Sequence, residues 1–235
     1  MRVAFSDRYL GWKDPPGVET ASPADLLRVL SSVPTDLGWD WAAQRLVPVL
    51  ERPGRELPDG EEPIGAITPS GTRYGYGLDM GMAFIRVSRS MAELWPVGDG
   101  EIDRTAMANL LHALEELEQV GWIPVDPDDD PSDPAALLVH LLNEPSGYAT
   151  SALLVPAVLS RILGRAEVVL TAPSRGILLA FGAGTPGRLI RATTETFEEV
   201  DPHPLQRGPF ILANGILTER SRRELLSWPE AMTVQ

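Results

Sequence analysis

One tetrapeptide in the second half of the chain carries two side chains suited to recognising a ligand. Residues 173–176, Pro-Ser-Arg-Gly, join the apolar runs VVLTA and ILLAF, so a hydroxyl and a guanidinium lie side by side at the joint. A guanidinium can hold a carboxylate through paired, charge-assisted hydrogen bonds. The same residues also suit an ordinary turn, because proline presets φ and glycine tolerates a positive φ. We favour a turn, and we keep Ser174 and Arg175 as candidate binding residues.

Ser174 could also act as a nucleophile if a base lay beside it. Asp201 and His203 would complete a Ser-His-Asp triad, and both belong to the segment DPHPL. However, no G-x-S-x-G elbow surrounds Ser174, and Asp201 is too close in sequence to His203 for its orientation to be inferred. No catalytic residue is therefore assigned, and His203 is kept as the third candidate binding residue. A hydrolase that uses Ser174 or acidic residues is the alternative function.

An acidic segment at residues 126–133 invites a comparison with calcium sites. An EF-hand loop that began at Asp126 would need glycine at its sixth place and glutamate at its twelfth, where this chain has Pro131 and Leu137. We expect a solvated loop there. The chain lacks cysteine, and its three histidines share no metal-ligand spacing: His112, His140 and His203. The sequence predicts neither a metal nor a cofactor.

The charge and the hydropathy of the chain limit the classes of partner that we expect. The chain has 235 residues and a formal net charge of −13, and only one of its 20 basic residues is lysine. Such a balance argues against nucleic acid, which attracts clustered positive charge. No window approaches the roughly 18 uninterrupted apolar residues of a membrane span, and the N-terminus lacks the apolar run of a signal peptide. We predict a cytoplasmic protein whose partner is a protein or peptide, and the oligomeric state is left open.

The elements that would position these residues alternate between helices and strands. The strongest helical pattern covers residues 101–120, where one apolar stripe is formed by Ile102, Ala106, Leu110, Leu114 and Leu117. Further helices are expected at 22–33, at 147–164 with Thr150 or Ser151 as N-cap and Gly164 at the end, and at 185–200. The segment 40–54 is ambiguous because Pro48 interrupts a helical pattern.

The predicted strands cluster in hairpins. Residues 63–71 and 74–88 form one hairpin; the glycines at 71, 75, 77 and 81 within it match neither a dinucleotide fingerprint nor a P-loop. Strands are also expected at 121–127, 135–143, 166–173 and 175–182, and a last hairpin turns at Asn214-Gly215. The predicted fold class is α+β, with helices packed on a mixed or largely antiparallel sheet, in one unit or two sub-domains.

The second half resembles a known family. The segments GYATSALLVPAVLSRILGRAEVVLTAPSRGILLAF and DPHPLQRGPFILANGILTE are similar to the YtpQ-like family of uncharacterised bacterial proteins, a domain of unknown function. The likeness is strongest over residues 145–220. The family commonly has an acidic residue after the turn arginine, where this chain has Gly176. The resemblance implies an α+β domain at 98–235, after an N-terminal α+β region at 1–97 with Pro/Gly-rich loops, and it implies no reaction.

Taken together, these features predict a non-enzymatic regulatory or protein-interaction module. The prediction depends on the missing catalytic spacing, the missing phosphate loop and the expected sheet surface.

Overall fold

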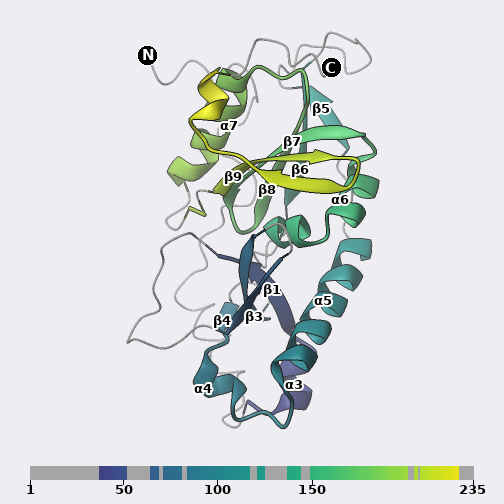
Figure 1. Cartoon of the computed structure of the whole chain (residues 1–235), viewed down its shortest axis with the longest axis vertical. Helices are drawn as coiled ribbons and strands as arrows, with labels where there is room; N and C mark the ends of the chain where they lie inside the picture. The colour runs from purple at the N-terminus through teal and green to yellow at the C-terminus, as the bar shows by residue number, and fades with distance from the viewer. Residues whose placement is uncertain are drawn as a thin grey trace.

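The computed structural model describes residues 37–51, 64–68, 71–80, 84–116, 121–124, 137–143, 149–200, 204–205 and 207–227. These residues form two antiparallel sheets with helices packed against them, which confirms the predicted α+β class (Figure 1). The predicted helix at 22–33, the acidic segment at 126–133, Asp201 and His203 lie outside the described residues.

The first sheet has four strands, β1 (Leu46–Leu50), β2 (Gly65–Ile67), β3 (Arg73–Asp79) and β4 (Phe84–Arg86). Their order is β1-β3-β2, and β4 also pairs with β3. The ambiguous segment 40–54 divides into a short helix, α3 (Trp39–Ala43), and β1. Pro48 is tolerated because β1 is an edge strand, where a missing N–H leaves no ladder bond unmade.

The predicted hairpin at 63–88 is confirmed in its first half, since β2 pairs with β3. The single strand expected over 74–88 is wrong, because β4 returns antiparallel to β3. A strand of that length would exceed the usual 3–10 residues. A short helix, α4 (Arg89–Ala92), follows, and Ser88 caps it by accepting a hydrogen bond from the Met91 N–H.

The second sheet has the strand order β10-β9-β7-β8-β6-β5. The strands are β5 (Trp122–Pro124), β6 (Leu138–Asn143), β7 (Glu167–Ser174), β8 (Ile177–Gly182), β9 (Arg207–Ala213) and β10 (Ile216–Glu219). The strand–turn–strand prediction for residues 168–180 is confirmed, and Val169, Ile177 and Leu179 are buried as expected. The hairpin at Asn214-Gly215 is confirmed too, and both residues have the positive φ that its turn requires.

Both faces of this second sheet are covered. One face packs in a core shared with the first sheet and with the helices α5 (Asp99–Glu116) and α6 (Pro156–Leu163). The opposite face packs under α7 (Gly187–Val200) and the C-terminal 3₁₀ turn η3 (Glu224–Ser227). This double coverage explains the continuous apolar runs of β7 and β8, because a strand buried on both sides has no polar alternation.

Helix α5 buries the predicted stripe, with Ile102, Ala106, Leu110 and Leu114 inside, while Leu117 lies outside the described residues. The helix packs on β1 of the first sheet, although it follows the predicted boundary at residue 97. That boundary stays a prediction. No helix in the described part is long and apolar enough to cross a membrane.

The single helix expected over 147–164 is wrong, because the structure breaks it. A 3₁₀ turn, η2 (Ala149–Leu154), precedes α6, and Pro156 begins α6 because proline suits the first turn of a helix but not its interior. Thr150 and Ser151 do not cap a helix. Their hydroxyls donate to the carbonyl oxygens of Arg175 (3.0 Å) and Pro48 (2.6 Å). Gly164 ends α6 at φ 63°, as predicted.

Candidate functional site

In the structure, residues 173–176 form the end of β7 and the turn into β8. Ser174 is the last residue of β7, is buried and lies opposite Ile177. Arg175 belongs to the two-residue turn, and its carbonyl oxygen accepts hydrogen bonds from both the N–H and the hydroxyl of Thr150. Within the described residues, no acid or base is hydrogen-bonded to the Ser174 hydroxyl. Ser174 and Arg175 lie together at this turn and His203 lies outside the described residues, so a binding site formed by the three stays a prediction.

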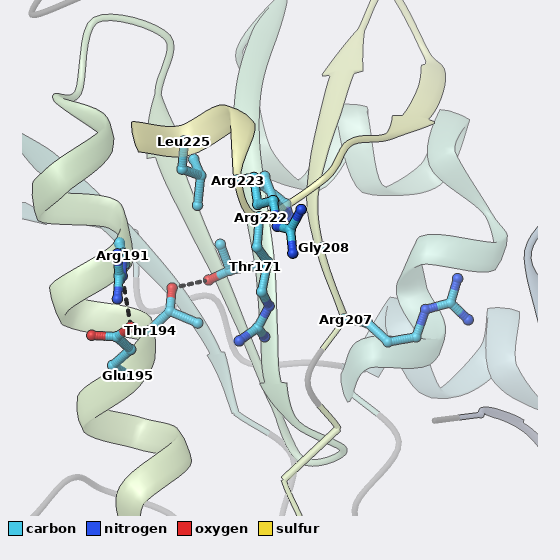
Figure 2. A pocket seen from close by; sticks show the side chains of 10 residues that line it. Thr171, Arg191, Thr194, Glu195, Arg207, Gly208, Arg222, Arg223 and Leu225 are labelled. Atoms are coloured by element: carbon cyan, nitrogen blue, oxygen red, sulfur yellow. Dashed lines mark hydrogen bonds and ion pairs between the residues drawn. The ribbon is translucent and has the colours of Figure 1, made fainter. Parts of the chain in front are cut away.

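A pocket of about 240 Å³ opens elsewhere on the same sheet, between β7, β9, α7 and the segment that leads into η3 (Figure 2). It is lined by Thr171, Arg191, Thr194, Glu195, Arg207, Gly208, Pro209, Arg222, Arg223 and Leu225. We call it the bulge pocket, because a break in the sheet ladder forms its floor.

The break lies between β7 and β9. Leu170 pairs with Phe210 and Ala172 with Arg207, so Thr171 alone faces the two residues Gly208 and Pro209. Such a bulge bends a strand and is often found beside functional sites. Pro209 contributes no backbone donor here.

Glycine is required at the first position of this bulge. Gly208 has a φ of +88°, and a Cβ on it would lie 2.9 Å from the Phe210 ring. Both the backbone conformation and the close ring therefore exclude a larger side chain.

Two buried hydroxyls form a relay at the floor. Thr194 Oγ1 lies 2.7 Å from the Ile190 carbonyl oxygen and 2.8 Å from Thr171 Oγ1. A hydroxyl has one proton and a carbonyl oxygen can only accept. We therefore infer that Thr194 donates to Ile190 and accepts from Thr171. The remaining lone pairs of these hydroxyls can accept a hydrogen bond from a group that enters the pocket.

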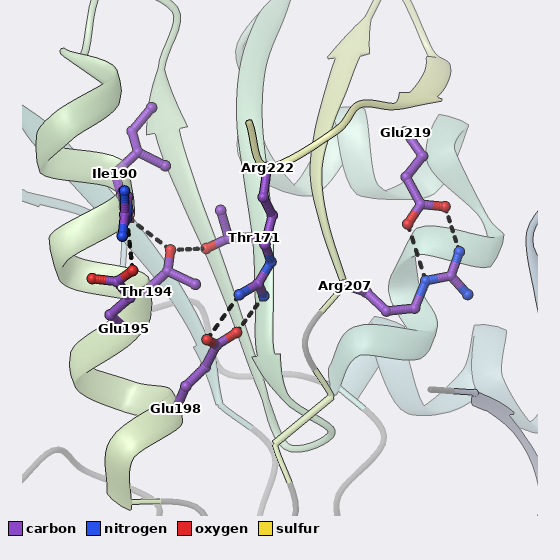
Figure 3. A network of polar contacts seen from close by, with 9 residues as sticks. Thr171, Ile190, Thr194, Glu195, Glu198, Arg207, Glu219 and Arg222 are labelled. Carbon is purple, nitrogen blue, oxygen red and sulfur yellow. Dashed lines mark hydrogen bonds and ion pairs between the residues drawn. The ribbon is translucent and has the colours of Figure 1, made fainter. Parts of the chain in front are cut away.

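Ion pairs surround the pocket (Figure 3). Arg191 pairs with Glu195 one turn along α7, at 2.7 Å, and both side chains are nearly half exposed. Arg222 forms a two-pronged pair with Glu198, whose side chain is only 10% exposed. This pair fastens the segment before η3 to α7.

Arg207 lines the pocket with its stem, and its guanidinium points away from the other labelled side chains (Figure 2). The guanidinium pairs with Glu219 on β10 and donates to the carbonyl oxygen of Glu51, 3.2 Å away, just after β1. Arg207 thus links the second sheet to the first.

Arg223 differs from the other three arginines. Its side chain is exposed, and among the described residues it has no carboxylate partner. Arg191, Arg207 and Arg222 each have one, so the pocket retains an excess of positive charge in a chain whose net charge is −13. An anionic group is therefore the ligand that this lining suits.

The segment that contains Arg222 and Arg223 is fixed by side-chain packing as well as by the ion pair with Glu198. Leu225 of η3 is buried in the core beneath α7, with Leu189, Ile190 and Phe197. The arginines are therefore presented by an anchored segment.

The lining offers little for acid–base chemistry. Its ionisable side chains are four arginines and Glu195, and arginine keeps its proton throughout the physiological range. Within the described part of the chain, no group of three or more His, Cys, Asp or Glu side chains is placed to hold a metal ion. The guanidiniums of this lining suit the binding of an anion.

Sequence reasoning missed this pocket, although two local signals were present. Three arginines occur within four residues, 220–223, of an otherwise acidic chain. Arg191, Thr194, Glu195 and Glu198 also share one helical face, at spacings of three and four. No local pattern showed that these two segments would meet at a sheet bulge.

Comparisons with known proteins give no information about the family or the function of this chain. No family model, curated protein or solved structure matches the chain. The resemblance to the YtpQ-like family stays a prediction.

Proposed function

We propose that this protein is a non-enzymatic, regulatory protein-interaction module that receives an acidic side chain of a partner in the bulge pocket. The observation that carries the proposal is Arg223, an exposed guanidinium without a carboxylate partner among the described residues, at the rim of a preformed pocket. A guanidinium offers a carboxylate two parallel hydrogen bonds.

Arg191 provides a second cation, and little stability is lost when it leaves its present partner. Its pair with Glu195 is an exposed i,i+4 pair, a class that contributes only about 0.3–0.5 kcal/mol. An incoming carboxylate can therefore replace Glu195 as the partner of Arg191. Arg222 stays with Glu198, because removing one member of a mostly buried pair leaves the other charge uncompensated.

The size of the pocket favours a side chain over a large ligand. Its volume of about 240 Å³ is below the roughly 300–1,000 Å³ typical of drug-sized ligands. A glutamate or aspartate of a protein or peptide fits that scale. A partner of this kind agrees with the acidic composition, which disfavours nucleic acid, and we keep a cytoplasmic location as part of the proposal.

Fluorescence anisotropy with a labelled peptide tests the proposal. The probe is the heptapeptide Val-Thr-Val-Thr-Glu-Glu-Gly, and its counterpart has glutamine at both acidic positions. We expect binding of the acidic probe only, and a loss of at least about tenfold in affinity for Arg223→Gln and for Arg191→Gln, because a hydrogen bond to a charged group contributes about 1.5–3 kcal/mol.

Arg104→Gln is the matched control. Arg104 is exposed on α5 and pairs with Glu101, so this change also removes one positive charge from an exposed helical ion pair, but outside the bulge pocket. The control should bind like the wild type. Equal affinity for the two probes, or an equal loss in Arg104→Gln, would reject the proposal.

A further inference from the structure

Strand β10 is an edge strand of the second sheet as the described residues form it. It pairs with β9 on one side and has no other neighbour among the described strands. The Arg220 N–H donates to the Pro209 carbonyl oxygen at 2.8 Å, so the backbone of Arg220 faces β9. In an antiparallel pair the facing residues alternate. Thr218 and Ile216 therefore also face β9, and the N–H and C=O groups of Leu217 and Glu219 point outward.

These outward groups are unpaired within the part of the chain that the structure describes, where no N–H or C=O group is hydrogen-bonded to them from the outer side. Three of the four side chains of the strand are exposed, with Ile216 at 69%, whereas Leu217 is buried in the core. An open edge of this kind is a template for another strand.

The usual protection of an edge is weak in β10. Edge strands commonly carry an unpaired lysine, a proline or a bulge. The only charge in β10 is that of Glu219, and Arg207, whose side chain is 7% exposed, neutralises it. A chain that approaches this edge therefore meets no isolated like charge.

The charges next to β10 indicate which chain would bind. Arg220, Arg222 and Arg223 follow the strand directly, and Arg220 is bonded to Pro209, a lining residue of the bulge pocket. The C-terminal end of β10 thus lies beside the bulge pocket. An acidic residue on an extended chain along β10 would lie beside this basic segment.

We infer that the partner's acidic segment binds as an added strand along the outer edge of β10, with its acidic residue beside Arg223. This mode rests on the proposed function and specifies how the partner's backbone is held. Leu217 and Glu219 supply backbone hydrogen bonds, which give affinity without sequence preference, and the arginines select the acidic side chain.

Backbone N-methylation of the acidic heptapeptide tests this mode without altering the protein. One analogue is methylated on its odd-numbered residues and the other on its even-numbered residues. In an added strand only alternate N–H groups face β10. We therefore expect one analogue to lose at least about tenfold in affinity while the other binds like the parent peptide. Equal affinities for both analogues, whether retained or lost, would overturn strand addition.

Hydrogen exchange gives a second measurement. The parent peptide should slow exchange of the Leu217 and Glu219 amides, and unchanged exchange would overturn the inference. If acidic and glutamine probes bind alike, the proposed function fails. If binding depends on Arg223 but not on the methylation pattern, only strand addition fails.

A second copy of the chain is the competing occupant of this edge. Sedimentation equilibrium should show a monomer, with and without peptide. A dimer that the peptide does not dissociate would assign the β10 edge to self-association and overturn the inference.

Discussion

Replacing His140 by phenylalanine should remove a large part of the acid sensitivity of this fold. His140 lies on β6, is 1% exposed, and neither ring nitrogen has a hydrogen-bond partner among the described residues. The ring centres of His140 and Trp122 lie 5.6 Å apart. The Arg165 guanidinium lies over the Trp122 ring, 4.1 Å from its centre. Burial, and then the positive charge of Arg165, lower the pKa of His140 below its ordinary value of 6.5.

The direction and size of the effect follow from proton linkage. The folded state holds His140 neutral, whereas the unfolded chain protonates it below about pH 6.5, so stability is fully present above that pH and is lost as the pH falls. At pH 5, the loss approaches about 2 kcal/mol for a histidine that stays neutral in the fold. At pH 7.5 the substitution should be neutral or stabilising, because it removes two unpaired buried nitrogens.

Urea denaturation at pH 7.5 and pH 5 measures the effect. The wild type should lose more stability than His140→Phe between these two conditions, with about 2 kcal/mol as the upper limit for a histidine that stays neutral in the fold. His112→Gln is the control, because His112 lies on the exposed side of α5, and it should lose as much as the wild type. The same pH dependence in the wild type and in His140→Phe would refute the reasoning.

Three further changes test the packing and the turn. Leu114→Ala should lower the free energy of unfolding by about 2–5 kcal/mol, and a loss below about 1 kcal/mol would mean that this face of α5 is not packed as described. Burial and the hydrogen bond to Asp103 raise the pKa of Tyr74 to about 12, so stability should fall as the pH rises above 10. In Asp103→Ala, ultraviolet titration should give a lower pKa for Tyr74, and an unchanged value would contradict this contact. Arg175→Ala should change stability by about 1 kcal/mol or less, whereas weakening of peptide binding by more than about 1.5 kcal/mol would make Arg175 an anchor.

The correct predictions from sequence depend on short-range signals. The stripe of α5 repeats at helical spacing, and Asn214-Gly215 supplies two residues that tolerate a positive φ. The turn at Arg175 and Gly176 lies between two apolar runs of strand length. In each case the residues that decide the structure are neighbours in the chain, so the pattern is visible without any knowledge of the fold.

The failed prediction of a single helix over 147–164 involves contacts between distant segments. The spacing over 147–164 is helical, yet the Ser151 hydroxyl donates to the Pro48 carbonyl oxygen, 103 residues away. Thr150 likewise bonds to Arg175 instead of capping a helix. A hydroxyl can satisfy its hydrogen bond locally or at a distance, and only the packed chain selects one of these.

The sequence by itself determined that the protein is an α+β fold with arginine as its dominant cation, and it suggested a guanidinium as the recognition group. The guanidinium that it named, Arg175, stays a candidate, and only the tertiary structure gathers Arg191, Arg222 and Arg223 around one pocket. That pocket depends on the bulge opposite Thr171 and on the pair between Glu198 and Arg222, which are 24 residues apart. The register of β7 with β9 and the docking of η3 on α7 bring these groups together, and both are set by burial of side chains from separate segments, which no local pattern records.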